Sequence, residues 1–353
     1  MMDPLERKLL LEGTVIPAHP LALTEQRMLD EQSQRALTRY YMDAGAGGIA
    51  VGVHTTQFEI RDPEFKLFEK VLTLAMEEVE KARLKRPFIK VAGICGPTDQ
   101  AVKEAEFAKS IGYSMGLLNM GNLDHYSEEE LLARAKAVAD LIPVFGFYLQ
   151  PSVGGRVLSY RFWSEFSNIQ NVHAIKIAPF DRYKTLDVVR AVCQSPRRDD
   201  IALYTGNDDS IIHDLLSIYK VHIDGKWVEK RIAGGLLGHW AVWTKRAVDL
   251  FEELKKARME PSIPGQWLMK ANEVTDANSV LFDAKNHFKG CIAGINEVLA
   301  RQGLLQGNWC LKPEEQLSPG QNEEIDRIYQ EYPHMNDDEF IKENIERWRK
   351  HSS

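Results

Sequence analysis

The sequence predicts an α/β fold, a (β/α)₈ barrel followed by a helical extension. Short apolar segments alternate with longer amphipathic segments along the chain, a pattern typical of parallel βαβ units. Eight such units fit within residues 13–257, close to the roughly 250 residues of an ordinary barrel. We expect residues 258–353 to form the extension. A doubly wound open sheet is the alternative, but the glycine-rich phosphate turn expected after its first strand is missing.

The expected strands are apolar runs rich in branched residues and bounded by turn residues. Their ranges are 14–19, 48–54, 88–95, 114–119, 144–150, 172–178, 201–206 and 232–238. Helices are expected between them, for example at 25–44, 64–84, 98–110, 127–141 and 182–194. Thr24, Thr98 and Ser127 stand where a helix N-terminus favours a small hydroxyl residue.

Two segments do not belong to a minimal barrel. Residues 220–231 contain Asp224-Gly225 between alternating runs, which predicts a β-hairpin before the eighth strand, on the face away from catalysis. We expect it to be structural or to form an oligomer contact. The segment 258–353 is helical by pattern, with prolines near 261–264 and 313–319, and residues 336–350 are expected to form a solvated amphipathic helix.

Composition excludes several classes of function. A net charge of −7 and a pI near 5.9 give a nucleic-acid partner no electrostatic support. The N-terminal residues do not resemble a signal peptide, and no stretch approaches the length of a membrane span. The four cysteines are far apart and form no Cys-x-x-Cys pair, which indicates reduced thiols in a cytoplasmic protein.

Lys176 is the first candidate for chemistry because it interrupts the apolar run 172–178. On a strand, Ile175 and Ile177 would pack on one face, and Lys176 would share the other face with Ala174 and Ala178. Burial disfavours the charged form of lysine, and a neutral amine attacks carbonyl carbons to form a Schiff base. The alternative is a lysine that extends its ammonium to water at the strand end.

The same alternation places two further polar residues. In the second strand His54 shares a face with Gly52, and in the fifth strand Tyr148 shares a face with Gly146, while Phe147 points to the helices. Three strands would thus direct His54, Tyr148 and Lys176 into one space lined by small residues. A bulge in any strand would change this alternation.

Four short motifs occur in order along the chain. They are Tyr148-Leu149-Gln150-Pro151, Lys176 placed 28 positions after Tyr148, Gly206-Asn207-Asp208, and Gly234-Gly235. Together with the tail at 282–305, they resemble the dihydrodipicolinate synthase and N-acetylneuraminate lyase family of class I aldolases over nearly the whole chain. The resemblance implies that Lys176 forms the Schiff base and that Tyr148 moves protons to and from the reacting oxygen.

The sequence also departs from that family. Its Gly-Thr-Thr-Gly-Glu loop, which binds the substrate carboxylate, corresponds to Gly52–Gln57, and a shift of one or two residues gives Thr55 and Thr56 that role. The second tyrosine, after strand 4, has no counterpart in the loop that ends at Leu123, and the arginine after strand 5 is Val153. We therefore do not expect dihydrodipicolinate synthesis itself. His54 would supply acid–base function, or it is a hydrogen-bonded pocket histidine without a chemical role.

Other polar residues remain as candidates for substrate binding. His239 and Trp240 follow the eighth strand and would either select the substrate or pack against a helix. Gly206 and Asn207, with Thr205 beside them, would bind substrate or cap the seventh helix. A zinc site of His19, His54 and His239 has no ligand-spacing motif, so we expect no metal and no cofactor.

The sequence thus predicts a cytoplasmic lyase, an aldolase or a dehydratase, that binds a 2-oxo acid such as pyruvate or a sugar-derived keto acid through Lys176. The resemblance suggests a homodimer or a homotetramer. The alternative function is a ligand-binding or regulatory protein that keeps the barrel and has lost turnover. The altered loop and the missing arginine leave the choice between aldol cleavage and dehydration open.

Overall fold

The structure, a computed structural model, describes residues 2–350. The chain forms two compact units. One comprises Met1–Thr14 and Ile89–Leu236, and the other comprises Val15–Phe88 and Leu237–Ser353.

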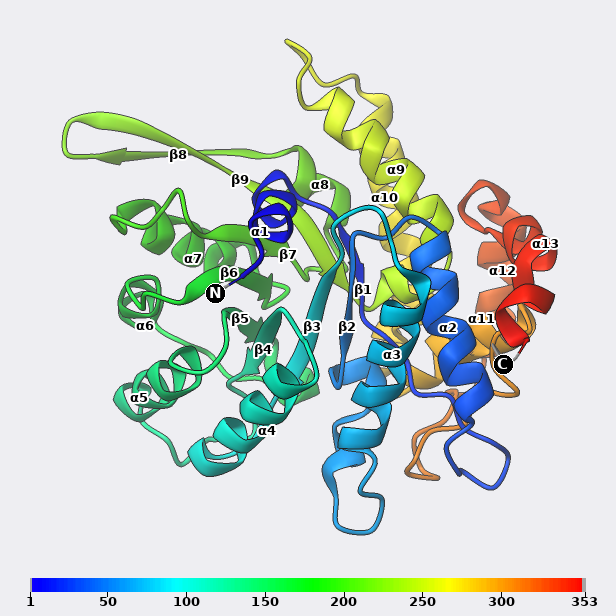
Figure 1. Ribbon diagram of the computed structural model, residues 1–353. Coiled ribbons are helices and arrows are strands. Elements are labelled where there is room, and N and C mark those ends of the chain that lie inside the picture. The colour runs from blue at the N-terminus through cyan, green and yellow to red at the C-terminus, as the bar shows by residue number, and fades with distance from the viewer. Residues whose placement is uncertain (1, 351–353) are drawn as a thin grey trace. The chain divides into compact units, whose positions relative to one another are not determined.

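The first unit is a parallel sheet covered by helices (Figure 1). Its strands pair in the order β3, β4, β5, β6, β7 and β9, all parallel. The strands are β3 Ile89–Ile94, β4 Met115–Asn119, β5 Val144–Leu149, β6 Val172–Ala178, β7 Ala202–Thr205, β8 Ile218–Ile223 and β9 Lys226–Leu237. The helices are α1 Pro4–Glu12, α4 Thr98–Ser110, α5 Glu128–Ala139, α6 Tyr160–Phe166, α7 Arg182–Gln194 and α8 Ile211–Leu216, with a 3₁₀ turn, η3, at Pro151–Val153.

The second unit contains the first two strands and the C-terminal helices. Its strands and short 3₁₀ segments are β1 Val15–Pro17, β2 Gly48–Val51, η1 His54–Thr56, η2 Phe58–Arg61, η4 His239–Ala241, η5 Ala284–Asn286 and η6 Pro333–Met335. Its helices are α2 Glu31–Asp43, α3 Phe68–Ala82, α9 Thr244–Ala257, α10 Gln266–Leu281, α11 Cys291–Arg301, α12 Gln321–Glu331 and α13 Asp338–Arg349.

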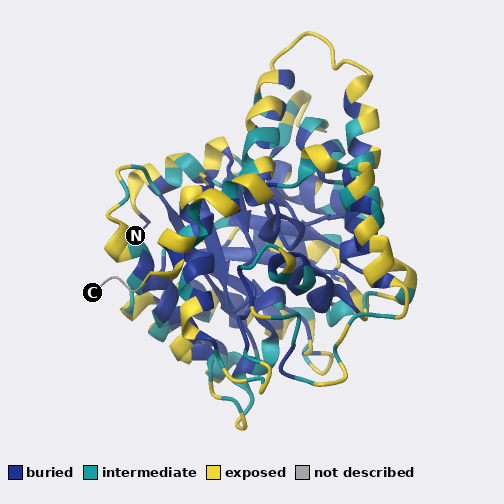
Figure 2. Ribbon diagram, turned by 90° about the vertical axis from the view of Figure 1, so that its right-hand side faces the viewer, coloured by how far each residue is buried: buried dark blue, intermediate teal, exposed yellow. Residues whose placement is uncertain are grey.

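The sheet topology confirms the predicted fold class. Among the described residues, the strand order is β1-β9-β7-β6-β5-β4-β3-β2, with β8 paired to β9 off this path. A parallel bridge between Ala18 and Ala50 connects the β1 segment with β2, the two ends of that order. This is the arrangement of a (β/α)₈ barrel. Figure 2 shows the strands of the barrel as buried, whereas the exposed residues lie mainly on helices, on loops and on the β8–β9 hairpin.

Several predicted boundaries are confirmed and others need correction. Helices α4 and α7 and strand β6 have the predicted ranges, and the Ser127 side chain accepts a hydrogen bond from the Glu130 N–H at the start of α5. Helix α2 begins at Glu31 rather than at residue 25, because the Asp30 side chain caps it. Strand β2 ends at Val51, because Gly52 has a φ of +77° and turns the chain.

The predicted hairpin is confirmed. Strands β8 and β9 pair antiparallel around Asp224 and Gly225, whose φ angles of +47° and +79° suit a two-residue hairpin turn. Strand β9 then continues without a break from the hairpin arm into the barrel strand, so it starts at Lys226 instead of residue 232. Figure 1 shows the two arms side by side as a long hairpin.

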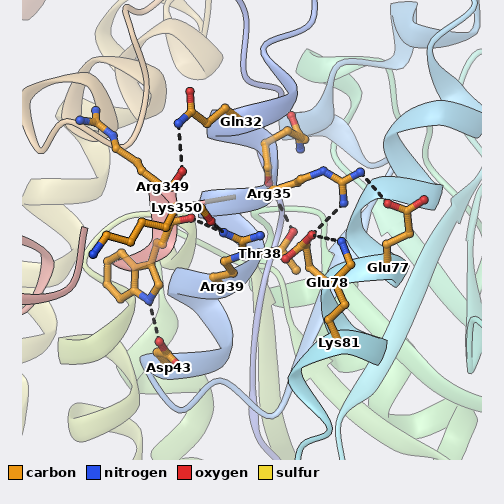
Figure 3. A network of polar contacts seen from close by, with 12 residues as sticks. Gln32, Arg35, Thr38, Arg39, Asp43, Glu77, Glu78, Lys81, Arg349 and Lys350 are labelled. Atoms are coloured by element: carbon orange, nitrogen blue, oxygen red, sulfur yellow. Dashed lines mark hydrogen bonds and ion pairs between the residues drawn. The ribbon is translucent and has the colours of Figure 1, made fainter. Parts of the chain in front are cut away.

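The C-terminal helix α13 confirms the expected amphipathic helix, and its apolar face is anchored to the protein. Ile341 and Trp348 are each only 1% exposed. The Trp348 indole N–H donates to Asp43 of α2 at 2.6 Å, and Arg39 of α2 donates to the carbonyl oxygens of Trp348 and Lys350 (Figure 3). Helix α13 therefore packs on α2. The division into a barrel, 13–257, and an extension, 258–353, stays a prediction, although α9 does end at Ala257.

Candidate functional site

Lys176 lies in the middle of the first unit's sheet. The parallel register places it level with Phe147 of β5 and Tyr204 of β7, so these three side chains share one face. Lys176 is 7% exposed, and its Nζ lies 4.4 Å from the centre of the Phe147 ring. A Cβ atom on Gly206 would come within 2.4 Å of the Lys176 Cε. The lysine stem thus occupies the space that the missing side chain of Gly206 leaves.

Burial changes the chemistry of this amine. It lowers the pKa of Lys176 to about 8, against an opposing effect of the nearby Asp208 carboxylate, which favours the charged form. At pH 7 a group with this pKa is neutral in about a tenth of the molecules, compared with well under a thousandth for an ordinary lysine. Lys176 can therefore act as a nucleophile toward a carbonyl group near neutral pH.

Asp208 and Phe147 belong to this site, and the sequence prediction did not include them. Asp208 is 4% exposed and lies in the turn directly after β7, where its N–H bonds to the Gly206 carbonyl oxygen at 3.1 Å. The motif Gly206-Asn207-Asp208 already contains this acidic residue, so its place directly after β7 was a signal that could have identified it as a site residue. Phe147 was assigned to the wrong face.

We expect Asp208→Asn to lower the pH at which Lys176 becomes reactive. Asp208 raises the pKa of Lys176, so removing its charge moves that pKa further below about 8. The pH midpoint of labelling by an amine-directed reagent, followed on the Lys176 peptide by mass spectrometry, should fall accordingly. Asp209→Asn is the matched control, because Asp209 is exposed and adjoins Asp208 in the chain. A midpoint that stays in place in Asp208→Asn would contradict the assignment.

Tyr148 lies on the opposite face of β5 from Phe147, and the predicted alternation in this strand is wrong. Its ring contacts Trp163 of α6 with centroids 5.1 Å apart, and its hydroxyl makes hydrogen bonds with the backbone N–H and carbonyl oxygen of Leu158, both at 3.3 Å. A Cβ on Gly146 would likewise meet Phe166 of α6. The face of β5 that contains Gly146 and Tyr148 is therefore the one that packs against the helices.

A bulge between β5 and β6 causes this difference. Val144 pairs with Val172, but the next residue, Phe145, pairs with Ala174, so His173 of β6 has no paired residue in β5. Without that residue, Tyr148 would stand level with Lys176. With it, Phe147 takes this place, and Tyr148 pairs with Ile177.

Asn207 has its amide engaged within the protein. Its Nδ2 donates to Thr185 at 3.1 Å and to Asp214 at 3.0 Å, and its Oδ1 accepts the Phe180 N–H at 3.1 Å. These bonds connect the turn after β7 with α7 and α8. These contacts favour a structural role for Asn207 over direct substrate binding.

His54, Thr55 and Thr56 lie in the second unit and form η1. His54 lies beyond the end of β2, so strand alternation does not apply to it; its ring lies 5.9 Å from that of Phe58. The Thr55 hydroxyl donates to the Ala18 carbonyl at 2.8 Å, and the Thr56 hydroxyl donates to the His19 carbonyl at 2.6 Å. Both hydroxyl hydrogens hold the loop to the β1 segment, so neither points to a ligand in this conformation.

His239 and Trp240 form η4 at the end of β9, and both pack against helices. The His239 Nδ1 lies 3.3 Å from the amide nitrogen of Asn278 on α10, and burial lowers the pKa of His239 to about 4. Trp240 packs against Phe251 of α9, with ring centroids 6.1 Å apart. Both residues also line a cavity between α9 and α10.

The third histidine of the zinc alternative, His19, has both ring nitrogens engaged. They lie 2.8 Å from the Pro20 carbonyl oxygen and 2.9 Å from the Thr38 hydroxyl, and burial lowers the pKa of His19 to about 4. Within residues 2–350, no group of three or more His, Cys, Asp or Glu side chains has a geometry that could hold a metal ion.

Comparison with known proteins identifies the family. The sequence profile of the dihydrodipicolinate synthetase family matches residues 12–221. The chain belongs to this family. A curated relative, the 4-hydroxy-tetrahydrodipicolinate synthase of Clostridium novyi (strain NT), is 30% identical over 122 residues, which cover 34% of this chain and 39% of the relative. The chain thus matches well under half the length of that relative.

Solved structures of the dihydrodipicolinate synthetase family confirm the fold. The dihydrodipicolinate synthase of Oceanobacillus iheyensis superposes with a TM-score of 0.72 at 16% identity, covering 93% of this chain and 99% of that one. The N-acetylneuraminate lyase of Fusobacterium nucleatum gives 0.69 at 16% identity, covering 91% and 99%. No described helix of this chain is both long and apolar enough to cross a membrane.

Proposed function

We propose that the protein is a lyase that forms a Schiff base between Lys176 and a 2-oxo acid such as pyruvate. The observation that carries the proposal is the buried Lys176 amine, whose pKa of about 8 is maintained by burial in a member of the dihydrodipicolinate synthetase family. One solved relative from Fusobacterium nucleatum, 17% identical, is an N-acetylneuraminate lyase complexed with pyruvate, which supports this substrate class.

The chemistry follows from the amine. The neutral Lys176 Nζ attacks the carbonyl carbon, and the carbonyl oxygen leaves as water after it gains two protons. The resulting iminium withdraws electrons, so an electron pair left on the neighbouring carbon is stabilised. That carbon can then form or lose a bond to an aldehyde, or release an adjacent hydroxyl as water. An aldolase and a dehydratase share these steps, and both remain within the proposal.

The remaining residues from the sequence prediction keep proposed roles. Thr55 and Thr56 are proposed to bind the substrate carboxylate, through backbone N–H groups because their hydroxyl hydrogens bond to Ala18 and His19. His54 is proposed as an acid–base group, and Gly206 as the residue that leaves room for the Schiff base. A cytoplasmic location and a homodimer or homotetramer stay predictions.

Borohydride trapping tests the proposal. We expect incubation with pyruvate and borohydride to add the reduced adduct to the peptide that contains Lys176, and Lys176→Met to remove the label. Lys230→Met is the matched control, because burial also lowers the pKa of Lys230, but its Nζ donates to the Ile201 carbonyl at 2.8 Å. The proposal fails if a broad set of 2-oxo acids leaves the wild-type protein unlabelled, or if the Lys176→Met protein is still labelled.

Tyr148→Phe distinguishes two roles of Tyr148. In this structure its hydroxyl ties Leu158 to β5, so we expect a loss of about 1 kcal/mol in the free energy of unfolding. We also expect the trapping rate with pyruvate to change by less than about threefold. Borohydride trapping quenched at a series of times measures the rate, and denaturant titration measures the free energy of unfolding. A fall in rate of about a hundredfold, typical of a lost general acid or base, would instead assign the hydroxyl to proton transfer.

A non-catalytic, ligand-binding member of the family is the second candidate function. The specific observation in its favour is that the Tyr148 hydroxyl and the two threonine hydroxyls bond to the protein's own backbone. This alternative predicts measurable binding of a 2-oxo acid, for example by calorimetry, together with the absence of a borohydride-trapped adduct.

A further inference from the structure

A cavity of about 250 Å³ lies between α9, α10 and η6 in the second unit. For scale, an engineered apolar cavity of about 150 Å³ accommodates benzene. The cavity therefore has room for one ring with a short side chain. Its lining comes from the second unit alone, and it includes residues of η4 as well as of the three elements.

The cavity has an aromatic and apolar lining. Trp240 and Trp243 contribute to it and are 2% and 3% exposed, and Val274 from α10 is 6% exposed. Trp243 also has a φ of +52° and a ψ of +35° at the start of α9. A bulky residue in this left-handed conformation costs about 1–2 kcal/mol, and such strain is concentrated at functional positions such as ligand clamps.

The rim carries charges of both signs, but they do not balance. Three lining residues are acidic, Asp249, Glu253 and Glu273, and two are basic, Arg246 and Lys270, so with histidine counted as neutral the formal charge is 2 − 3 = −1. Both basic side chains already have partners in the protein. Lys270 pairs with Glu253 at 2.9 Å, and Arg246 donates to the Asn336 carbonyl at 3.2 Å.

Asp249 and Glu253 each pair with a lysine, whereas Glu273 has no lysine or arginine partner within residues 2–350. Its carboxylate lies 3.2 Å from the Nε2 of His334 in η6, and its side chain is 25% exposed. An anion in the cavity would be repelled by this carboxylate, whereas a cation would compensate its charge.

We propose that this cavity binds a protonated amine that carries one apolar ring. The ammonium group pairs with Glu273, and the ring packs against Trp240 and Trp243. The site is built from residues other than Lys176 and is independent of the Schiff-base proposal, because an amine cannot form an imine with lysine.

The test compares three probes of similar shape: 2-phenylethylamine, 2-phenylethanol and phenylacetate. We expect the full-length protein to bind the amine with a Kd of about 1 mM or tighter, and at least tenfold more tightly than the alcohol or the acid, measured by ligand-observed NMR. Glu273→Gln should weaken amine binding about tenfold. Glu260→Gln, in the exposed turn after α9, is the matched control and should leave it unchanged.

A second variant fills the cavity. Val274→Trp should abolish binding of all three probes, provided that circular dichroism shows a folded protein; Glu273→Gln changes a rim residue and tests the proposal if Val274→Trp does not fold. The proposal is overturned if the amine does not bind, if phenylacetate binds as tightly as the amine, or if Glu273→Gln or a folded Val274→Trp protein binds the amine as the wild type does.

Discussion

Gly206→Ala is expected to abolish borohydride trapping at Lys176. The added Cβ would lie 2.4 Å from the Lys176 Cε and 2.8 Å from the Ala178 Cβ. The lysine stem can move, but the Ala178 Cβ is fixed to the backbone of β6, so either β7 shifts or Lys176 leaves its position. A displacement of about 1 Å in a reacting group typically costs about a hundredfold in rate. We therefore expect the trapping rate with pyruvate to fall by at least that factor.

The control for this substitution is Gly265→Ala. Apart from its two chain neighbours, no described residue has a heavy atom within 4 Å of the Cβ that would be added at Gly265, just before α10, so trapping and stability should stay unchanged. Gly206→Ala should in addition lower the free energy of unfolding by about 1–3 kcal/mol, as overpacking in a core does. Wild-type trapping rates in a folded Gly206→Ala protein would show that the reacting amine does not occupy the space beside Gly206.

The fold was predictable because its signals are local. The apolar run of β6 and the amphipathic patterns of α4 and α7 are each contained in the residues of the element itself. The predicted boundaries of these three elements agree with the structure. Long-range pairing was not predictable in the same way. The residue left over between the pairs Val144–Val172 and Phe145–Ala174 does not change the composition of either strand, but it moves Tyr148 to the opposite face from the one expected.

The candidate site was likewise predictable only in part. Lys176 was predictable because a lysine within an apolar strand is unusual and indicates a buried amine. Burial is also the property that lowers its pKa. The roles of the threonines were not predictable, since a hydroxyl in a loop can donate either to a ligand or to a nearby carbonyl. The structure places the Ala18 and His19 carbonyls within 3 Å of Thr55 and Thr56, respectively, and no local pattern indicates this.

Glu78→Gln is expected to have the largest effect on stability. Glu78 lies on α3, its side chain is 2% exposed, and its two oxygens accept hydrogen bonds from Arg35 at 2.7 Å and from Arg39 at 2.6 Å (Figure 3). Arg39 in turn bonds to the end of α13. Removing the central charge leaves two largely buried guanidinium groups close together. We expect a loss of about 2–3 kcal/mol in the free energy of unfolding, since breaking a buried ion pair is strongly destabilising.

Glu77→Gln is the matched control for this substitution. Glu77 precedes Glu78 on the same helix and also pairs with Arg35, but its side chain is 43% exposed. Exposed pairs contribute less than about 1 kcal/mol, so Glu77→Gln should change the denaturation midpoint little. Equal effects of the two substitutions would show that the burial of Glu78 adds nothing to the strength of its ion pairs.

The pH dependence provides an independent check on Glu78. Burial raises the pKa of this carboxyl group, but hydrogen bonds from Arg39 and Arg35 outweigh burial and leave the pKa below its ordinary value. A carboxylate with a lowered pKa in the folded state stabilises the protein fully above the unfolded value, near 4.3, and this contribution disappears as the pH falls through the folded pKa. The difference in stability between the wild type and Glu78→Gln should therefore be constant from pH 6 to 8 and shrink below about pH 4. A difference that persists undiminished in acid would mean that the cost of Glu78→Gln comes from lost packing and not from lost charge.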